Sequence, residues 1–298
     1  PEPTRPPMAR RRSLFFKQTP TLPGFGLSFG VSTLYLALII LLPVSALFIY
    51  VSDMSWAQYW QAITDRRVVS SYVVTLQGAL FSTLIASAIG LLLAWIITRY
   101  EFPGRRLLDA LVDLPFALPT AVAGLTLSVL LVPGGWIGQF FTPEWLGRFL
   151  PEGFKIAYAF PGLLVAMTFT SLPFVVRTVQ PVLQDLGADL EEAADTLGAT
   201  RAQTFFRVVL PMLVPALVTG ASQAFIRSLG EFGAVIMIAG NIPFKTEVSS
   251  LMIFVRLQEY EYSAAAAIAS VILMASLTLL FALQLVQARF FSWQGRGR

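Results

Sequence analysis

The residues best suited to a specific contact lie in one polar stretch of an otherwise apolar sequence, L-Q-D-L-G-A-D-L-E-E-A-A-D-T-L-G-A-T-R-A-Q-T-F-F-R-V-V-L-P, residues 183–211. Small and acidic side chains alternate there. Ala193 and Ala194 would let the groove of another protein approach the backbone closely, and Glu192 would offer a charged contact that fixes the register. The chemistry of this stretch is therefore that of docking and not of catalysis.

The spacing in this stretch predicts a helix, a turn and a second helix along a membrane surface. Apolar residues recur at helical spacing with acidic residues opposite, at Leu183, Leu186, Leu190, Ala193, Ala194 and Leu197. Gly198 can end that helix in the left-handed conformation. Thr200 can cap a second short helix from Arg201 to Val208, and Leu210 and Pro211 lead into the next apolar segment. The alternative is an amphipathic connector that packs only on its own chain.

The residue types exclude several kinds of catalysis. No cysteine and no histidine occurs, which excludes thiol catalysis, disulfides, zinc sites built from these residues and imidazole acid–base chemistry. The lysines are Lys17, Lys155 and Lys245, and each follows a phenylalanine. A P-loop needs Gly-Lys-Ser or Gly-Lys-Thr to hold nucleotide phosphates. We therefore expect no catalytic, cofactor or metal site in this chain. If its function depends on ATP hydrolysis, we expect the ATPase to be a separate chain.

A few charges fall inside or beside apolar runs and are candidates for a translocation pathway. Arg227 and Glu231 are four residues apart, which suits an ion pair on one helix face. Because charges in a membrane usually face a cavity or each other, Arg227 could instead line the path of an anion, or the pair could act as an outer gate. Arg177 could meet an exiting anion, although an anchor at the inner membrane surface is the alternative.

The elements that must position these residues are long apolar helices. The chain has 298 residues, of which 56% are hydrophobic and 13% charged, and its mean hydropathy is +0.70. Uncharged runs are long enough to cross a hydrocarbon core of about 30 Å. We predict an all-α membrane protein with six spans, at residues 27–50, 69–98, 108–132, 157–178, 209–238 and 263–288, and a coupling loop at 183–208. Pro115 and Pro119 would tilt or break the start of the third span.

The arginines predict the orientation. Arg10 to Arg12 precede the first span, Arg105 and Arg106 precede the third, and Arg289 follows the last. By the positive-inside rule these ends lie in the cytoplasm, which places both termini and the loop at 183–208 inside. Residues 1–23 would form a flexible cytoplasmic leader and residues 291–298 a cytoplasmic tail. The cations cluster at helix ends, so the net charge of +4 does not indicate a nucleic-acid partner.

The polar stretch also matches a known signature. Glu192-Ala193-Ala194, Gly198, Val208 and Leu210-Pro211 follow the spacing E-A-A-x3-G-x9-I-x-L-P, with valine in place of the preferred isoleucine. This resembles the cytoplasmic loop of permease subunits of ATP-binding-cassette (ABC) importers, which grips the ATPase. The resemblance implies that Glu192, Ala193, Ala194, Gly198, Leu210 and Pro211 couple this chain to that partner.

Four further segments resemble one subfamily, the T-type (U-type) permease subunits of sulfate and thiosulfate importers. They are Leu22–Gly26, Leu114–Gly124, Ser228–Ala234 and Gln258–Ser263, and the resemblance extends from about Leu22 to Arg289. It implies the type I (MetI-like) permease fold in a bacterial inner membrane. The implied partners are a related W-type permease, an ATPase dimer that holds ATP and Mg, and a periplasmic sulfate/thiosulfate-binding protein.

Other functions remain open at the level of the sequence. The segment from Gly230 to Ala234 also resembles permeases for molybdate, so molybdate, tungstate or phosphate are alternative cargoes. A secondary transporter driven by an ion gradient would need buried carboxylates in broken midplane helices, and Glu231 is the one candidate. A membrane scaffold without transport would leave the docking stretch without a purpose.

Overall fold

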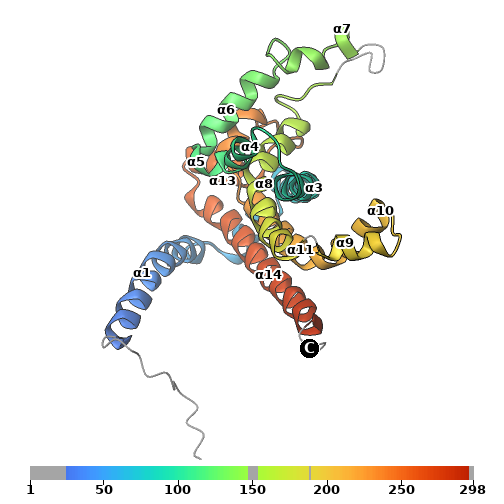
Figure 1. The fold of residues 1–298 in the computed structure, drawn as a ribbon. Helices are drawn as coiled ribbons and strands as arrows, with labels where there is room; N and C mark the ends of the chain where they lie inside the picture. The colour runs from blue at the N-terminus through green and yellow to red at the C-terminus, as the bar shows by residue number, and fades with distance from the viewer. Residues whose placement is uncertain (1–24, 147–153, 188, 295–298) are drawn as a thin grey trace, which may run out of the picture. The chain divides into compact units, whose positions relative to one another are not determined.

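The computed structural model describes residues 25–146, 154–187 and 189–294 (Figure 1). In these ranges the ordered elements are helices, and no strand occurs among them. The leader predicted at 1–23 and residues 295–298 of the predicted tail lie outside the described residues. The chain divides after Ala46 into two compact units, and the helices that carry the polar residues belong to the second.

The N-terminal helix α1 (Phe25–Ser52) carries no charged residue, and none of its side chains is buried. At 28 residues it is long enough to cross a bilayer. Between the first two predicted spans lies a short helix, α2 (Trp56–Thr64). Ser55 and Gln58 form a capping box at its start, because each side chain binds the other residue's backbone N–H.

Three long helices form the centre of the second unit. They are α3 (Arg66–Arg99), α8 (Phe160–Asp185) and α11 (Leu210–Leu229), and each contacts the other two. Glycines permit the close approach: a Cβ on Gly90 would lie 2.8 Å from a Val175 side-chain atom, and one on Gly220 would lie 2.9 Å from the Val175 Cα. Small residues at contacts are typical of helices that associate in membranes.

The third predicted span, 108–132, is divided and not continuous. It comprises α4 (Arg105–Val112), α5 (Leu114–Ala117) and α6 (Thr120–Leu131). Pro115 and Pro119 lie at the junctions, where their missing N–H groups and fixed φ end one helix and begin the next. With 12 residues, α6 extends over roughly 18 Å, less than the hydrocarbon core.

Five described helical segments are long and apolar enough to cross a membrane, so the count of six is not confirmed. The five are Phe25–Ser52, Arg66–Arg99, Phe160–Asp185, Arg201–Leu229 and Tyr262–Leu285. Between α6 and α8 lie two short helical turns, η1 (Gly138–Phe141) and α7 (Pro143–Leu146).

The fifth predicted span, 209–238, is also interrupted. The helix α11 ends at Leu229, residues 230–232 are not helical, and α12 (Gly233–Ile238) follows and packs on α6. A helix absent from the sequence analysis comes next, α13 (Ser249–Gln258), which packs against α14 (Tyr262–Gln294). Since α14 continues to Gln294, residues 291–294 of the predicted tail are helical.

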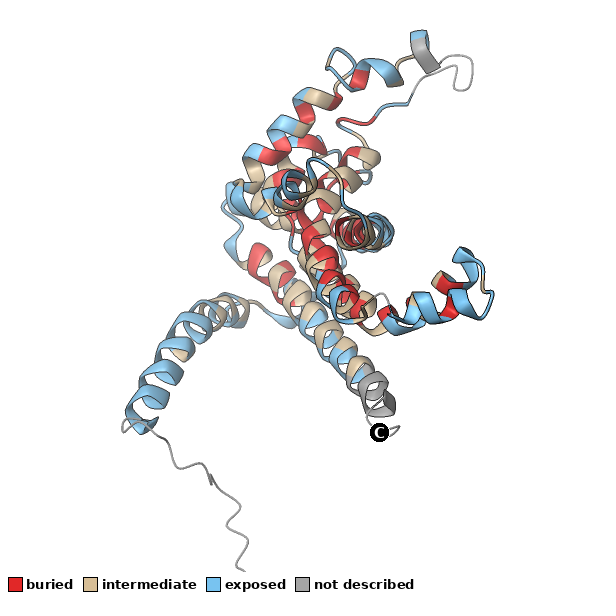
Figure 2. Ribbon diagram, in the orientation of Figure 1, coloured by how far each residue is buried: buried red, intermediate tan, exposed pale blue. Residues whose placement is uncertain are grey.

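Buried residues follow the contacts between these helices. Figure 2 shows them along α8 and on one face of α3, whereas the segment with α9 (Asp189–Thr196) and α10 (Arg201–Thr204) is mostly exposed. Large apolar side chains are exposed in many of the long helices, among them Leu76, Leu80, Leu84, Leu92 and Phe281. A surface of this kind is suited to lipid and to apolar partner helices.

Candidate coupling site and charged residues of the core

The polar stretch forms two helices with a sharp turn, but its first helix is shorter than the sequence predicts. The predicted helix over 183–197 is two elements, because α8 ends at Asp185 and α9 begins at Asp189. Gly187 has φ +60 between them. This left-handed conformation costs glycine little and turns the chain out of α8.

The turn after α9 is confirmed in the geometry expected from Gly198. Gly198 has φ +78, its N–H donates to Asp195 O at 2.9 Å, and the Ala199 N–H donates to Ala194 O at 3.0 Å. These two bonds define a Schellman motif, which satisfies the last carbonyl groups of the helix. The left-handed glycine therefore fixes the angle at which the chain leaves α9.

The cap at Thr200 is also confirmed, whereas the separate second helix is not. Thr200 Oγ1 accepts from the Gln203 N–H at 3.3 Å, and Gln203 Oε1 accepts from the Thr200 N–H at 2.8 Å. The helix α10 then passes through a π-helical turn, Phe205–Val209, directly into α11. Because Pro211 has no N–H, an α-helical ladder would be broken here, and the wider turn lets the helix continue. The second docking helix is thus the first turns of a core helix.

The signature residues differ in exposure. Glu192, Ala193 and Gly198 are exposed, and Leu197 shows 88% of its surface. Ala194 is 8% exposed and packs on its own chain. Of the two alanines, Ala193 is therefore the more open to a partner, whereas Ala194 lets α9 lie close to the helix that follows it.

One arginine of α3 holds in place the predicted coupling loop, residues 183–208, which is called the docking segment from here on. Arg99 Nε lies 2.8 Å from Glu191 Oε1, and Arg99 Nη2 donates to Gly187 O at 2.9 Å. The Nε–H is not well aligned with the carboxylate, so the first contact is mainly Coulombic. Arg99 also lies over the Trp95 ring, at 5.8 Å, and Trp95 meets Phe205 edge to face. The last turn of α3 thus contacts both ends of the docking segment.

These contacts border a cavity of about 880 Å³ between α3 and the docking segment. Trp95 and Phe205 supply apolar walls, and Glu192, Asp195 and Arg201 supply charge. Ala193 of α9 and Leu197, which follows α9, do not line this cavity and are exposed in the described chain.

All five N–H groups of the Arg177 guanidinium are bonded to residues of its own chain. Its guanidinium donates to both carboxylate oxygens of Asp113, at 2.8 and 2.6 Å, and to Oδ1 and the backbone oxygen of Asp109, at 2.6 and 2.8 Å. A fifth bond of 2.6 Å goes to Gln180 Oε1. An arginine has five N–H donors, so none is left for an anion. This geometry favours the anchoring interpretation over the pathway interpretation of Arg177.

The structure brings Arg227 and Glu231 together, although Glu231 lies beyond the end of α11. Arg227 Nη1 is 2.6 Å from Glu231 Oε2, and the Ala234 N–H donates to Glu231 Oε1 at 3.0 Å. The Glu231 side chain is 1% exposed and that of Arg227 is 32% exposed. Glu231 therefore links the end of α11 to the first turn of α12, and Arg227 carries the partly open side of the pair.

Two of the segments that carry the sequence resemblance contact each other. A Cβ on Gly124 would lie 2.3 Å from Ala234 O, and a Cβ on Gly233 would lie 2.1 Å from Thr120 Oγ1. The backbones of α6 and α12 can approach to this extent only because both positions lack a side chain. The motifs at 114–124 and 228–234 are thus two sides of one contact.

Several interacting residues were missed in the sequence. Asp109 and Asp113 are four residues apart on α4 and its end, a spacing that could have indicated a shared cation. Gly187 resembles Gly198 as a helix end, but the apolar spacing continued through it. The partners Arg67 and Glu247, joined at 2.7 and 2.8 Å, are 180 positions apart and had no local signal. Within the described ranges no cluster of three or more acidic side chains could hold a metal ion.

The sequence of the chain is similar to those of known transport proteins. Residues 86–292 match the family described as binding-protein-dependent transport system inner membrane component. The chain is 62% identical over 269 residues to the sulfate transport system permease protein CysT of Escherichia coli (strain K12), covering 90% of this chain and 94% of that protein. It is 45% identical over 257 residues to the corresponding protein of Synechocystis sp. (strain ATCC 27184 / PCC 6803 / Kazusa), covering 86% and 87%.

Solved structures share the fold at low sequence identity. A bacterial ABC transporter that imports the acidic polysaccharide alginate has a chain with a TM-score of 0.71 and 18% identity, covering 88% of this chain and 94% of that one. A chain of an inward-facing methionine ABC transporter gives a TM-score of 0.54 and 20% identity, covering 79% and 99%. The fold is that of the membrane-embedded subunit of an ABC importer. The chain belongs to the binding-protein-dependent transport system inner membrane component family.

Proposed function

We propose that this chain is the permease subunit of an ATP-driven importer of sulfate and thiosulfate and provides half of the translocation pathway. The observation that carries the coupling role is the exposed helix-turn-helix between α8 and α11, whose second helix continues directly into a core helix. A push on α10 would therefore move α11 without an intervening hinge. The identity with relatives named as sulfate transport system permease proteins supports the cargo.

The docking surface on this proposal consists of Glu192, Ala193, Leu197 and Gly198, and it receives a groove of a separate ATPase. ATP and Mg would be held by that partner. Small and exposed residues permit close approach of the groove, while the fixed turn at Gly198 sets its angle. Leu210 and Pro211 would transmit the movement, and Arg177 would hold α4 against α8.

The topology proposed with this function has both termini, the leader at 1–23 and the coupling loop at 183–208 on the cytoplasmic side of a bacterial inner membrane. The loops that precede α3, α8 and α14 would then face the periplasm. The proposed assembly contains a W-type permease beside this chain, an ATPase dimer below it and a periplasmic sulfate/thiosulfate-binding protein above it. Apolar side chains exposed on the long helices would face lipid and the second permease.

Reconstitution of the full complex in lipid vesicles tests the proposal. The chain is coexpressed with a candidate permease, ATPase and sulfate-binding protein, and uptake of labelled sulfate is measured with and without ATP at the ATPase face. We expect uptake that requires ATP and is inhibited by thiosulfate.

Two outcomes would replace this function. Inhibition by molybdate, tungstate or phosphate but not by thiosulfate would change the cargo. Uptake driven by an ion gradient without ATP would indicate a secondary transporter and overturn the coupling role of 183–208.

A further inference from the structure

Two of the three lysines in the sequence line one cavity, at the N-terminal end of α8, whereas the docking segment follows the C-terminal end of the same helix. The cavity has a volume of about 550 Å³ and lies between the segment before α8 and the loop that joins α12 to α13. Its polar lining consists of Gln77, Lys155, Tyr158, Lys245 and Thr246. We propose that it is an outer oxyanion site, in which Lys155 and Lys245 attract the anion as it enters the permease. This inference rests on the proposed function and orientation.

The charge of the cavity supports an anionic ligand. Lys155 and Lys245 are its charged lining residues, and no carboxylate of the described chain forms an ion pair with either of them. Another cavity, of about 710 Å³, has the opposite character, since its charged lining residues are Asp53, Asp65, Arg256 and Glu261. The first cavity therefore favours anions, and the second favours cations.

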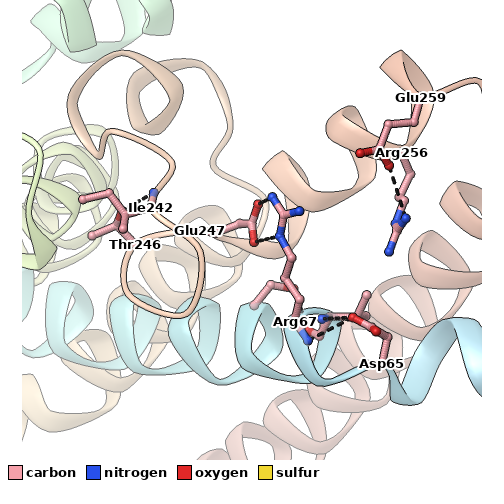
Figure 3. Close-up of polar contacts among 9 residues, drawn as sticks. Asp65, Arg67, Ile242, Thr246, Glu247, Arg256 and Glu259 are labelled. Atoms are coloured by element: carbon pink, nitrogen blue, oxygen red, sulfur yellow. Dashed lines mark hydrogen bonds and ion pairs between the residues drawn. The ribbon is translucent and has the colours of Figure 1, made fainter.

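The nearest acidic residue in the loop, Glu247, does not neutralise Lys245, because it forms an ion pair with Arg67. Glu247 is 1% exposed, and both of its carboxylate oxygens accept from Arg67 of α3, at 2.7 and 2.8 Å. Figure 3 shows the guanidinium meeting this carboxylate side-on. Such a two-point contact satisfies both charges. Glu247 therefore fastens the loop to α3 without neutralising the lysine.

The loop that presents Lys245 is held in one conformation. Thr246 Oγ1 donates to Ala239 O at 2.7 Å and accepts from the Ile242 N–H at 3.0 Å, the second of which is drawn in Figure 3. The Arg66 guanidinium lies over the Phe244 ring at 5.8 Å. A ligand site on such a loop needs little ordering when the ligand arrives.

The backbone around the cavity adopts conformations that side chains disfavour. Tyr158, Asn241 and Phe244 have φ of +58, +47 and +65, and they are three of the four non-glycine residues with positive φ in the described chain. Tyr158 is held there, because its N–H donates to Ile238 O at 2.8 Å and its hydroxyl accepts from Ser128 at 3.0 Å. Strained conformations of this kind concentrate at ligand sites.

The cavity is suited to weak, reversible binding of an anion and not to tight binding. Both lysines are exposed, so water screens their attraction. Ala159, Phe160 and Ile242 supply apolar walls, which strengthen the field within the cavity. A transport path needs binding that is favourable enough to admit the ion and weak enough to release it.

The electrostatic potential in the cavity can be tested with charged thiol reagents, and this test does not depend on transport. The sequence contains no cysteine, so Gln77→Cys places a single thiol in the proposed site of the assembled complex. We expect a methanethiosulfonate with a sulfonate group to react faster than one with a trimethylammonium group, by about 10-fold, the lower end of electrostatic steering effects. Inorganic sulfate should slow the sulfonate reagent. The preference should disappear when Lys155→Gln and Lys245→Gln are added.

The matched control is Gln61→Cys, the same substitution in the acidic cavity. We expect the trimethylammonium reagent to be favoured there, with no effect of the two lysine substitutions. Equal reagent preference at Gln77→Cys with and without the lysines would overturn the proposal.

Transport distinguishes a cargo site from a contact with the binding protein. The variant with Lys155→Gln and Lys245→Gln should lower the maximal uptake rate several-fold at saturating binding protein, whereas Lys155→Arg with Lys245→Arg should retain it. A higher KM for the binding protein with an unchanged maximal rate would instead identify a docking contact and overturn the oxyanion site. If the unsubstituted complex itself fails to import sulfate, the proposed function fails, whereas the reagent preference still reports on the cavity.

Discussion

Arg99 joins the last turn of α3 to the first turn of α9, with 2.8 Å between its Nε and Oε1 of Glu191. The same guanidinium donates to Gly187 O at 2.9 Å, at the point where the chain leaves α8. The end of α3 therefore meets the end of α8 and the start of α9, which lie about 90 positions further along the sequence. A movement of the docking segment reaches α3 through this residue and α11 through the continuous helix.

Arg99→Gln should loosen the coupling between ATP hydrolysis and transport. Without the guanidinium, α9 can shift while α3 stays in place, so the number of ATP molecules hydrolysed per sulfate imported should rise about 3- to 10-fold, the range of a coupling free energy near 1 kcal/mol. The measurement is the ratio of phosphate release to uptake in vesicles. Arg106→Gln removes an exposed arginine from the same end of the fold and is the matched control.

The charge-reversed pair Arg99→Glu with Glu191→Arg separates the ion pair from the other contacts of Arg99. We expect it to recover part of the coupling ratio that either reversal loses alone. An unchanged ratio in Arg99→Gln, with normal copurification of the ATPase, would contradict the role of Arg99.

Gly198→Val should weaken docking of the ATPase through the backbone alone. A Cβ at Gly198 would meet no atom within 4 Å, but the residue has φ +78. A β-branched residue in this conformation costs about 1–2 kcal/mol, which corresponds to a loss of roughly 5- to 30-fold in the population of the docked turn. Copurification of the ATPase with this chain measures the effect.

Two further substitutions provide comparisons for Gly198→Val. Gly198→Asn should be milder, since asparagine adopts the left-handed conformation more readily. Gly230→Ala should have little effect on docking, because Gly230 has φ −92 and open space around its Cβ position. Equal copurification for Gly198→Val and Gly230→Ala would show that the turn does not set the docking geometry.

Arg227→Gln should destabilise the protein more than Glu231→Gln. The first change leaves a carboxylate that is 1% exposed without its cation, whereas the second leaves a guanidinium that is 32% exposed. Loss of one partner of a buried pair costs about 3–5 kcal/mol, and partial exposure of Arg227 places the expected loss at or below about 3 kcal/mol. Thermal unfolding in detergent compares the two variants.

The double variant Arg227→Gln with Glu231→Gln should recover most of the loss, since no unpaired charge remains. Sulfate uptake by the assembled variants then addresses the pathway. Normal uptake by Arg227→Gln would eliminate a role of Arg227 in anion passage, and the pair would be a link between α11 and α12 only.

Gly124→Ala should separate α6 from α12. Its Cβ would lie 2.3 Å from Ala234 O, a backbone atom that cannot rotate away. We expect a loss of stability of about 1–3 kcal/mol, as for other overpacked contacts. Gly134→Ala, where a Cβ meets nothing within 4 Å, is the control in the same thermal unfolding measurement. Equal stability of the two variants would mean that α6 and α12 can separate at no cost.

The sequence was sufficient for features that depend on neighbouring residues. The long apolar runs predicted the helices α1, α3, α8 and α14, because a run of uncharged residues can satisfy its backbone only as a helix in lipid. The left-handed turn at Gly198 and the cap at Thr200 were also predictable, because each depends on one residue and its own backbone.

Interruptions within apolar segments were harder to predict. Arg227 and Glu231 lie on either side of the end of α11 at Leu229, but their spacing of four residues also suits a continuous helix, so the sequence alone extends that helix to residue 238. Its end becomes clear when Glu231 turns inward to meet Arg227 and the N–H of Ala234. The same holds for the π-helical turn at Phe205–Val209, which makes the second docking helix part of α11.

The sequence by itself determined that this chain is an all-helical membrane protein with a polar helix-turn-helix segment and no P-loop pattern, since hydropathy, helix ends and the P-loop pattern are local properties. Only the tertiary structure decided which charges are available. It saturated Arg177 with Asp109 and Asp113, joined Arg67 to Glu247, and left Lys155 and Lys245 around one cavity. The physical reason is that the free energy of a charge depends on burial and on partners distant in the sequence, and these exist only once the helices have packed.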